Sequence, residues 1–63
     1  MLGDILKDLR TSRNITSDEL CKNLGIKPGS YRNYERNDRK PDYDTLCKLA
    51  DFYGVTTDFL LGR

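Results

Sequence analysis

The sequence contains no histidine and only two cysteines, Cys21 and Cys47. A structural zinc site uses about four cysteine or histidine ligands, so this composition does not supply one. Both cysteines fall on the apolar faces of expected helices, and we interpret them as reduced core residues. A disulfide between them is the alternative, although disulfides are rare in proteins of a reducing compartment. We therefore expect no metal and no cofactor.

Catalytic signatures are also missing. The chain has no glycine-rich phosphate loop and no nucleophile–base pair, and its ten acidic residues are spread over helix caps and surfaces. We therefore expect no catalytic residues and no enzyme. No small-molecule site is evident. No apolar run approaches the roughly 20 residues of a membrane span, and the charged start MLGDILKDLR is unlike a signal peptide. We expect a cytoplasmic protein that does not bind membranes.

Length and composition favour one globular domain over residues 1–63, with the N-terminal domain of a longer protein as the open alternative. At 37% hydrophobic and 33% charged residues, the chain is neither disordered nor membrane-like. Its net charge is only +1, but residues 27–40 contain five basic and two acidic residues, a local charge of +3. Clustered positive charge is typical of nucleic-acid-binding surfaces, although an ordinary solvated helix and loop can also produce it.

The central stretch, residues 15–36, reads ITSDELCKNLGIKPGSYRNYER and predicts two short helices joined by a tight turn. Thr16 and Glu19 have the spacing of a capping box, which starts the first helix. Gly25 is placed to end it with a positive φ angle. Pro28 fits the first position of the second helix, which we expect over about residues 28–36, because its missing N–H has no helical partner there.

The second helix of this pair is expected to bury one face and expose the other. Tyr31 and Tyr34 recur at helical spacing and should face the core. The opposite face then presents small, amide and guanidinium groups, which suits a helix that enters a DNA major groove. Arginine can donate two hydrogen bonds to guanine, and asparagine can pair bidentately with adenine. The residues expected to read bases are Arg32, Asn33, Ser30 and Gly29.

Three further helices are expected around this pair. Residues 2 to about 13 predict an amphipathic first helix. Asp42 is placed to cap a helix over residues 43–53, and Thr56 to cap a short helix over residues 57–61. One helical turn cannot bury three adjacent apolar residues, so we expect this end of the chain to face a partner. The expected interface residues are Phe59, Leu60 and Leu61.

The spacing from Ile15 through Gly25 to the Tyr34-Glu35-Arg36 run resembles the lambda-Cro/repressor-like family, also called the XRE family. The resemblance extends over nearly the whole chain, and its other matching positions are Leu6, Leu9, Arg10, Pro41, Leu46, Leu49-Ala50, Gly54-Val55 and Asp58 to Gly62. It implies a compact all-α domain of five helices, with a helix-turn-helix formed by helices 2 and 3. It also implies a transcriptional regulator, more often a repressor, that binds double-stranded DNA as a homodimer on a palindromic operator.

The resemblance assigns further roles by position. It implies an ion pair between Arg10 and Glu35 that locks the first helix to the third. It implies phosphate contacts from Ser17, Lys27, Arg36, Asn37, Arg39 and Lys40. The chain departs from the family pattern at the start of the recognition helix, where Pro28 replaces a residue that often reads bases. For this reason a protein-interaction module with the same fold, such as an antitoxin or adaptor, remains the alternative function.

Overall fold

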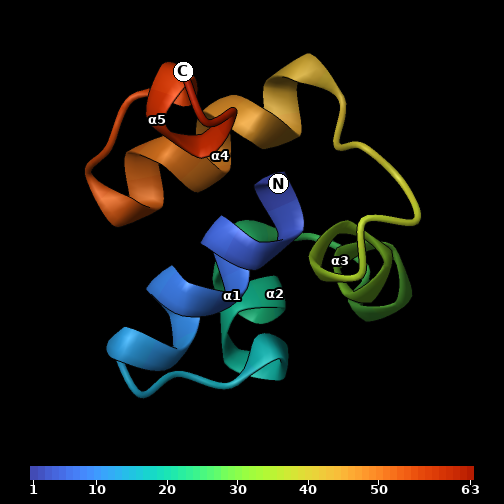
Figure 1. Cartoon of the computed structure of the whole chain (residues 1–63). Coiled ribbons are helices and arrows are strands. Elements are labelled where there is room, and N and C mark those ends of the chain that lie inside the picture. The colour runs from blue at the N-terminus through green and yellow to red at the C-terminus, as the bar shows by residue number, and fades with distance from the viewer.

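The computed structural model describes all residues 1–63 and consists of five helices without a strand (Figure 1). The helices are α1 (Leu2–Ser12), α2 (Ser17–Leu24), α3 (Pro28–Glu35), α4 (Tyr43–Tyr53) and α5 (Thr57–Leu60). The expected all-α fold is therefore confirmed, with α1, α3 and α5 each ending one residue earlier than expected. None of the five helices has the length and apolar character needed to cross a membrane.

Local signals in the sequence set the helix ends. Thr16 and Glu19 form the expected capping box at the start of α2, and Gly25 ends that helix with a φ angle of 68°. The Asp42 side chain accepts the Thr45 N–H at the start of α4 at 2.8 Å, and Thr56 caps α5 in the same way. These side chains satisfy N–H groups that have no partner within their own helix.

One core joins the five helices, and each helix contributes one side chain with no exposed surface. These residues are Leu6, Leu20, Tyr31, Leu49 and Leu60. In Figure 1, α1 lies between the α2–α3 pair and the α4–α5 pair, and α3 is at one side of the molecule, next to the loop that leads to α4. This arrangement leaves one flank of α3 facing away from the core.

The position of Leu60 corrects one prediction. We expected Leu60 to belong to a partner interface, but it is fully buried within its own chain, because the single turn of α5 points it into the core. Its neighbours behave differently: Phe59 is 51% exposed and Leu61 is 45% exposed. The exposed apolar surface at this end therefore consists of Phe59 and Leu61 without Leu60.

The two cysteines are free thiols, so the alternative of a disulfide is not realised. Cys21 is buried on α2, while Cys47 on α4 is half-buried. Burial raises the pKa of the Cys21 thiol above its ordinary value, and the nearby Asp18 carboxylate acts in the same direction. Cys21 is accordingly a protonated, unreactive core residue, since thiol chemistry requires the thiolate.

Candidate nucleic-acid interface

Two tyrosines anchor α3 to the rest of the fold. Tyr31 has no exposed surface and Tyr34 is 9% exposed, as their helical spacing predicts. Their rings meet edge to face, with centroids 6.4 Å apart and planes at 84°. Such pairs are stabilising beyond the area they bury. Because the inner face of α3 is fixed in this way, the opposite face has a defined orientation towards solvent.

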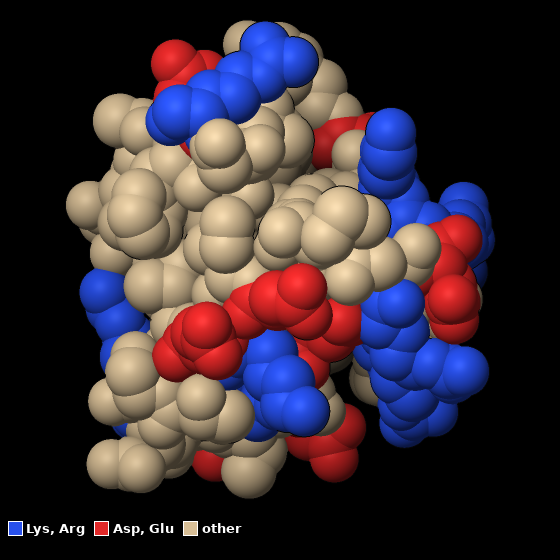
Figure 2. Space-filling view, in the orientation of Figure 1, with Lys and Arg blue, Asp and Glu red and all other residues tan.

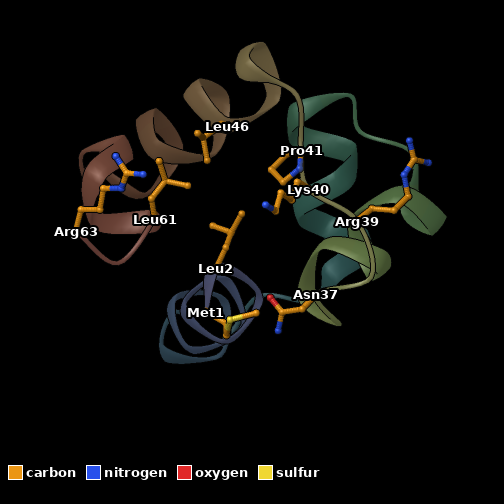
Figure 3. A pocket seen from close by; sticks show the side chains of 9 residues that line it. All are labelled: Met1, Leu2, Asn37, Arg39, Lys40, Pro41, Leu46, Leu61 and Arg63. Carbon is orange, nitrogen blue, oxygen red and sulfur yellow. The ribbon is translucent and has the colours of Figure 1, made fainter.

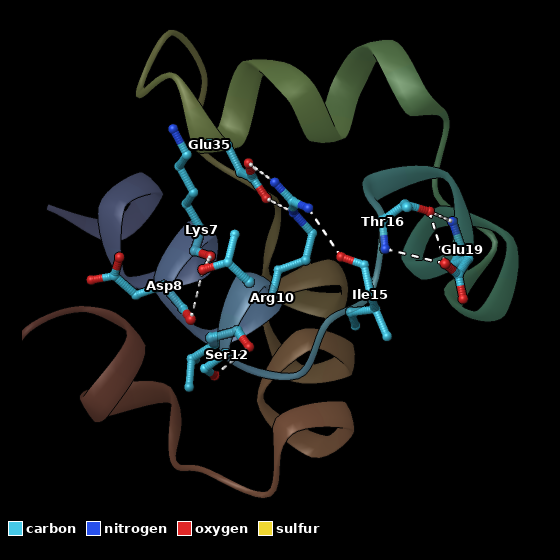
Figure 4. A network of polar contacts seen from close by, with 10 residues as sticks. Lys7, Asp8, Arg10, Ser12, Ile15, Thr16, Glu19 and Glu35 are labelled. Atoms are coloured by element: carbon cyan, nitrogen blue, oxygen red, sulfur yellow. Dashed lines mark hydrogen bonds and ion pairs between the residues drawn. The ribbon is translucent and has the colours of Figure 1, made fainter.

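An ion pair between Arg10 and Glu35 joins α1 to the end of α3 (Figure 4). Arg10 donates from Nε to Glu35 Oε2 at 2.7 Å and from Nη2 to Oε1 at 3.2 Å. It also donates to the Ile15 carbonyl at 3.0 Å. The two side chains are only 17% and 13% exposed. The expected structural pair is therefore present, and its two parallel hydrogen bonds fix geometry as well as charge.

The pair shifts the ionisation of both groups. Partial burial alone raises the pKa of Glu35, but the hydrogen bonds and positive charge of Arg10 outweigh it and lower the pKa below its ordinary value. The hydrogen bond to Glu35 likewise raises the pKa of Arg10. Both groups are thus charged near neutral pH, and Glu35 is a structural residue that is unavailable for DNA.

The outer face of α3 carries the residues expected to read bases. Arg32 and Gly29 are exposed, and Ser30 and Asn33 are half-buried. Neither the Arg32 nor the Asn33 side chain donates or accepts a hydrogen bond within the chain, so both have free polar groups. Pro28 and Gly29 begin α3 and are both exposed, so no long side chain covers the backbone at its first two positions.

Positive charge gathers beside this face. Figure 2 shows lysine and arginine side chains concentrated on the flank where α3 and the following loop lie in Figure 1. Lys27, Arg39 and Lys40 are exposed and form no ion pair. Arg36 is also exposed but contacts Asp38, with Nε and Oδ2 3.3 Å apart. Three of the cations expected to contact phosphate are therefore free, and the fourth has a solvent-exposed partner.

Ser17 lies at the first position of α2, half-buried, and its hydroxyl makes no hydrogen bond within the chain. A helix start supplies free backbone N–H groups and a partial positive charge, both favourable for phosphate. Asp18 and Glu19 in the same turn add negative charge, which weakens this site. The Ser17 hydroxyl is therefore free, but the charges around it are less favourable for an anion than those at Lys27 or Lys40.

Asn37 makes a structural contact that we did not expect. Its side-chain carbonyl accepts the backbone N–H of Gly3 at 2.9 Å, and its amide nitrogen, the group that can donate to phosphate, has no partner in the chain. Gly3 is buried against the end of α3, and a Cβ atom there would lie 2.5 Å from the Glu35 carbonyl oxygen. Sequence reasoning missed this junction, although a glycine inside the first turn of a helix was a sign of close approach.

The Gly3–Asn37 junction lies beside a cleft of about 410 Å³ (Figure 3). Its walls come from the start of α1, the loop after α3, helix α4 and the last residues of the chain. Leu2, Leu46 and Leu61 give it an apolar floor, while Arg39 and Lys40 belong to its loop side. The loop with the free cations is thus bordered by α3 on one side and by this cleft on the other.

A second contact outside the expectations fixes the far end of α1. Arg13 donates from Nη2 to the Tyr53 carbonyl at 2.7 Å, and its guanidinium lies 5.2 Å from the centre of the Tyr53 ring. The carbonyl is at the C-terminal end of α4, where a positive charge also interacts favourably with the helix dipole. Arg13 is therefore a structural residue that joins α1 to α4.

The chain matches a protein family and several transcriptional regulators. The sequence profile of a family described as Helix-turn-helix matches residues 6–60. The chain is 45% identical over 62 residues to the HTH-type transcriptional regulator ImmR of Bacillus subtilis, covering 98% of this chain and 49% of that protein. It is 43% identical over 61 residues to the SPbeta prophage-derived uncharacterized HTH-type transcriptional regulator YonR of the same organism, covering 97% and 56%.

A relative from another organism is also similar over most of this chain and about half of its own length. The cryptic phage CTXphi transcriptional repressor RstR of Vibrio cholerae is 34% identical over 55 residues, which cover 87% of this chain and 50% of that protein. The chain thus spans about half the length of the curated relatives it matches. These relatives are regulators of transcription, in agreement with the expectation that the chain is not an enzyme. With its matching profile, its five helices and the α2–turn–α3 unit, the chain belongs to the Cro/repressor-type helix-turn-helix family.

Proposed function

We propose that this chain is a DNA-binding domain of a transcriptional regulator and that α3 enters the major groove of double-stranded DNA. The observation that carries the proposal is the outer face of α3, where unpaired polar side chains lie next to free cations. An α-helix with its side chains is about 10–12 Å across, and the major groove is about 12 Å wide. The tyrosine-anchored α3 is therefore the right size to enter the groove with its core contacts intact.

Arg32 and Asn33 are the proposed readers of base identity. The exposed guanidinium of Arg32 can donate to both acceptors of guanine, and the amide of Asn33 can pair with adenine. Each such contact discriminates against a wrong base by about 1–3 kcal/mol. Ser30 and Gly29 complete the face: the serine hydroxyl can donate or accept, and the glycine lets the backbone approach thymine methyl groups.

The surrounding residues are proposed to position the domain on the DNA backbone. Lys27, Arg39 and Lys40 have free charges, Arg36 has an exposed one, and Ser17 lies at the start of α2. Contacts of this kind fix orientation and make affinity depend on salt, but they carry no sequence information. The +3 charge of residues 27–40 supports this role despite the net charge of only +1.

The regulator is proposed to act in the cytoplasm as a homodimer on a palindromic operator, and as a repressor. Phe59 and Leu61 at the α5 end support the dimer, because large exposed apolar side chains favour an interface. A two-fold dimer of such domains binds half-sites about 34 Å apart. One relative is itself named a transcriptional repressor.

Selection of bound sequences from random duplex DNA tests the function and gives the operator. On the selected duplex, Arg32→Ala and Asn33→Ala should each relax the preference at particular base pairs. Lys40→Ala should instead weaken binding to selected and random duplexes alike and flatten the dependence on salt. Equal effects of all three variants on every duplex would contradict the division into readers and positioners.

A protein-interaction module with this fold is the second candidate function. Pro28 and Gly29 favour it, because they leave the first two positions of α3 without a polar side chain. The two candidates separate in a fluorescence titration with random duplex at two salt concentrations. A DNA-binding domain binds more weakly at high salt, whereas an interaction module shows no salt-sensitive binding at either concentration.

A further inference from the structure

Two asparagines, each shortly after the end of a helix, have left-handed backbone conformations. Asn14 after α1 has a φ angle of 57°, and Asn37 after α3 has a φ angle of 62°. At each site the asparagine N–H and the next N–H bond back to carbonyls of the last helical turn. For Asn37 these bonds run to Tyr34 at 3.2 Å and, from Asp38, to Asn33 at 2.9 Å. This is the Schellman pattern of helix ends.

The side chains of the two asparagines differ. Asn37 Oδ1 accepts the Gly3 N–H, whereas the Asn14 side chain has no hydrogen-bond partner in the chain. Gly3 lies in the first turn of α1, where backbone N–H groups have no helical partner, and Met1 provides no side-chain cap. Asn37 therefore caps α1 from a position 34 residues away in the sequence.

The capped helix start and the cation-bearing loop are thereby tied together. Asn37 precedes Arg39 and Lys40, and all three line the cleft that also receives the start of α1 (Figure 3). We propose that Asn37 is a positioning residue, which holds residues 36–40 in the shape that their cations need to contact phosphate. This inference rests on the proposed DNA-binding function and assigns Asn37 a role in loop order in place of the direct phosphate contact expected from the sequence.

The chain offers a substitution that isolates the side chain. Glycine adopts the left-handed conformation without strain, so Asn37→Gly allows the same backbone pattern and removes the side-chain cap. Asn14→Gly makes the same change at a site without a side-chain partner and is the matched control. A loop that is no longer held has to be ordered when DNA binds, which weakens binding to every duplex by the same factor.

The test combines measurements on the free protein with DNA titrations. NMR gives the hydrogen-exchange rate of the Gly3 amide and the ¹⁵N order parameters of residues 36–40. Asn37→Gly is expected to speed Gly3 exchange, to lower the order parameters of the loop and to raise Kd about three- to ten-fold for selected and random duplexes alike. Asn14→Gly should change none of these. Asn37→Asp keeps an acceptor of the same reach and should restore Gly3 protection and loop order.

Several outcomes would overturn the proposal. If Asn37→Gly raises Kd while Gly3 exchange and loop order stay as in the wild type, Asn37 contacts phosphate directly. If exchange accelerates throughout the chain to the same extent, the residue contributes only to global stability. If no form of the protein binds DNA, the proposed function fails. The free-protein measurements then still show whether Asn37 holds the loop, but its role in phosphate binding falls with that function.

Discussion

The stability of a Gly3→Ala variant tests how closely α1 packs against α3. The added Cβ would lie 2.5 Å from the Glu35 carbonyl oxygen, 2.6 Å from that of Tyr34 and 2.8 Å from Asn37 Oδ1. The two nearest atoms belong to the backbone of α3, so relief requires the helices to separate. Separation also stretches the hydrogen bond between Gly3 and Asn37.

The expected size of this effect follows from three contributions. Overpacking typically costs about 1–3 kcal/mol, and loss of the hydrogen bond costs about 0.5–1.5 kcal/mol. Alanine recovers about 0.5–1 kcal/mol through its higher helix propensity. The net loss in the free energy of unfolding is therefore about 2 kcal/mol. In a domain of this size, that loss lowers Tm by roughly 8–16 °C.

Urea or thermal unfolding followed by circular dichroism measures this loss, and Gly29→Ala is its control. Gly29 occupies the same position in the first turn of α3 as Gly3 does in α1, but a Cβ there meets no atom within 4 Å. Gly29→Ala should therefore leave stability unchanged or raise it by up to about 1 kcal/mol. A Gly3→Ala variant as stable as Gly29→Ala would refute the close approach of α1 to α3.

Three further predictions concern the ion pair and the α5 end. Glu35→Gln leaves the Arg10 charge without its partner and should lower the free energy of unfolding, measured by urea unfolding, by about 3 kcal/mol. A loss below about 1 kcal/mol would mean that the pair contributes no more than an exposed ion pair does. Because the pKa of Glu35 is lowered in the folded state, its contribution is present above the unfolded-state value of about 4.3 and is lost as pH falls through the lower folded-state value. Urea midpoints should therefore fall below about pH 4, and Glu35→Gln should reduce that fall; an unchanged pH profile would contradict the shift. Leu61→Lys should weaken self-association in sedimentation velocity and leave folding intact, whereas Leu60→Lys should unfold the chain. If both substitutions had the same effect on folding, the buried position of Leu60 would be contradicted.

Features set by neighbouring residues could be predicted from the sequence. Thr16 with Glu19, and Asp42, mark helix starts because each cap is made within three residues of the chain. Gly25 marks a helix end because its left-handed φ angle strongly favours glycine. The burial of Tyr31 follows from helical spacing on a helix of two turns. These signals are short-range, and they predict the helices and the exposed face of α3, whereas the arrangement of the five helices was implied by the family resemblance.

Features that depend on how helices meet could not be predicted in the same way. The hydrogen bond between Gly3 and Asn37 joins residues 34 positions apart. A glycine in the first turn of α1 is a sign of close approach, but it does not identify the partner. The contact of Arg13 with Tyr53 spans 40 positions. Leu60 was misplaced because a single helical turn has no periodicity that tells which of three adjacent apolar residues faces the core. The packing of α5 on α1 and α4 decides this instead.

The central claim is that the outer face of α3 binds the DNA, and an NMR titration tests it most directly. Amide resonances of the ¹⁵N-labelled chain are followed as a selected duplex is added. Shifts should concentrate in α3, in residues 36–40 and at the start of α2, while α4 should change little apart from any dimer contact near α5. Shifts confined to α4 and α5, with Arg32 and Asn33 unaffected, would contradict it.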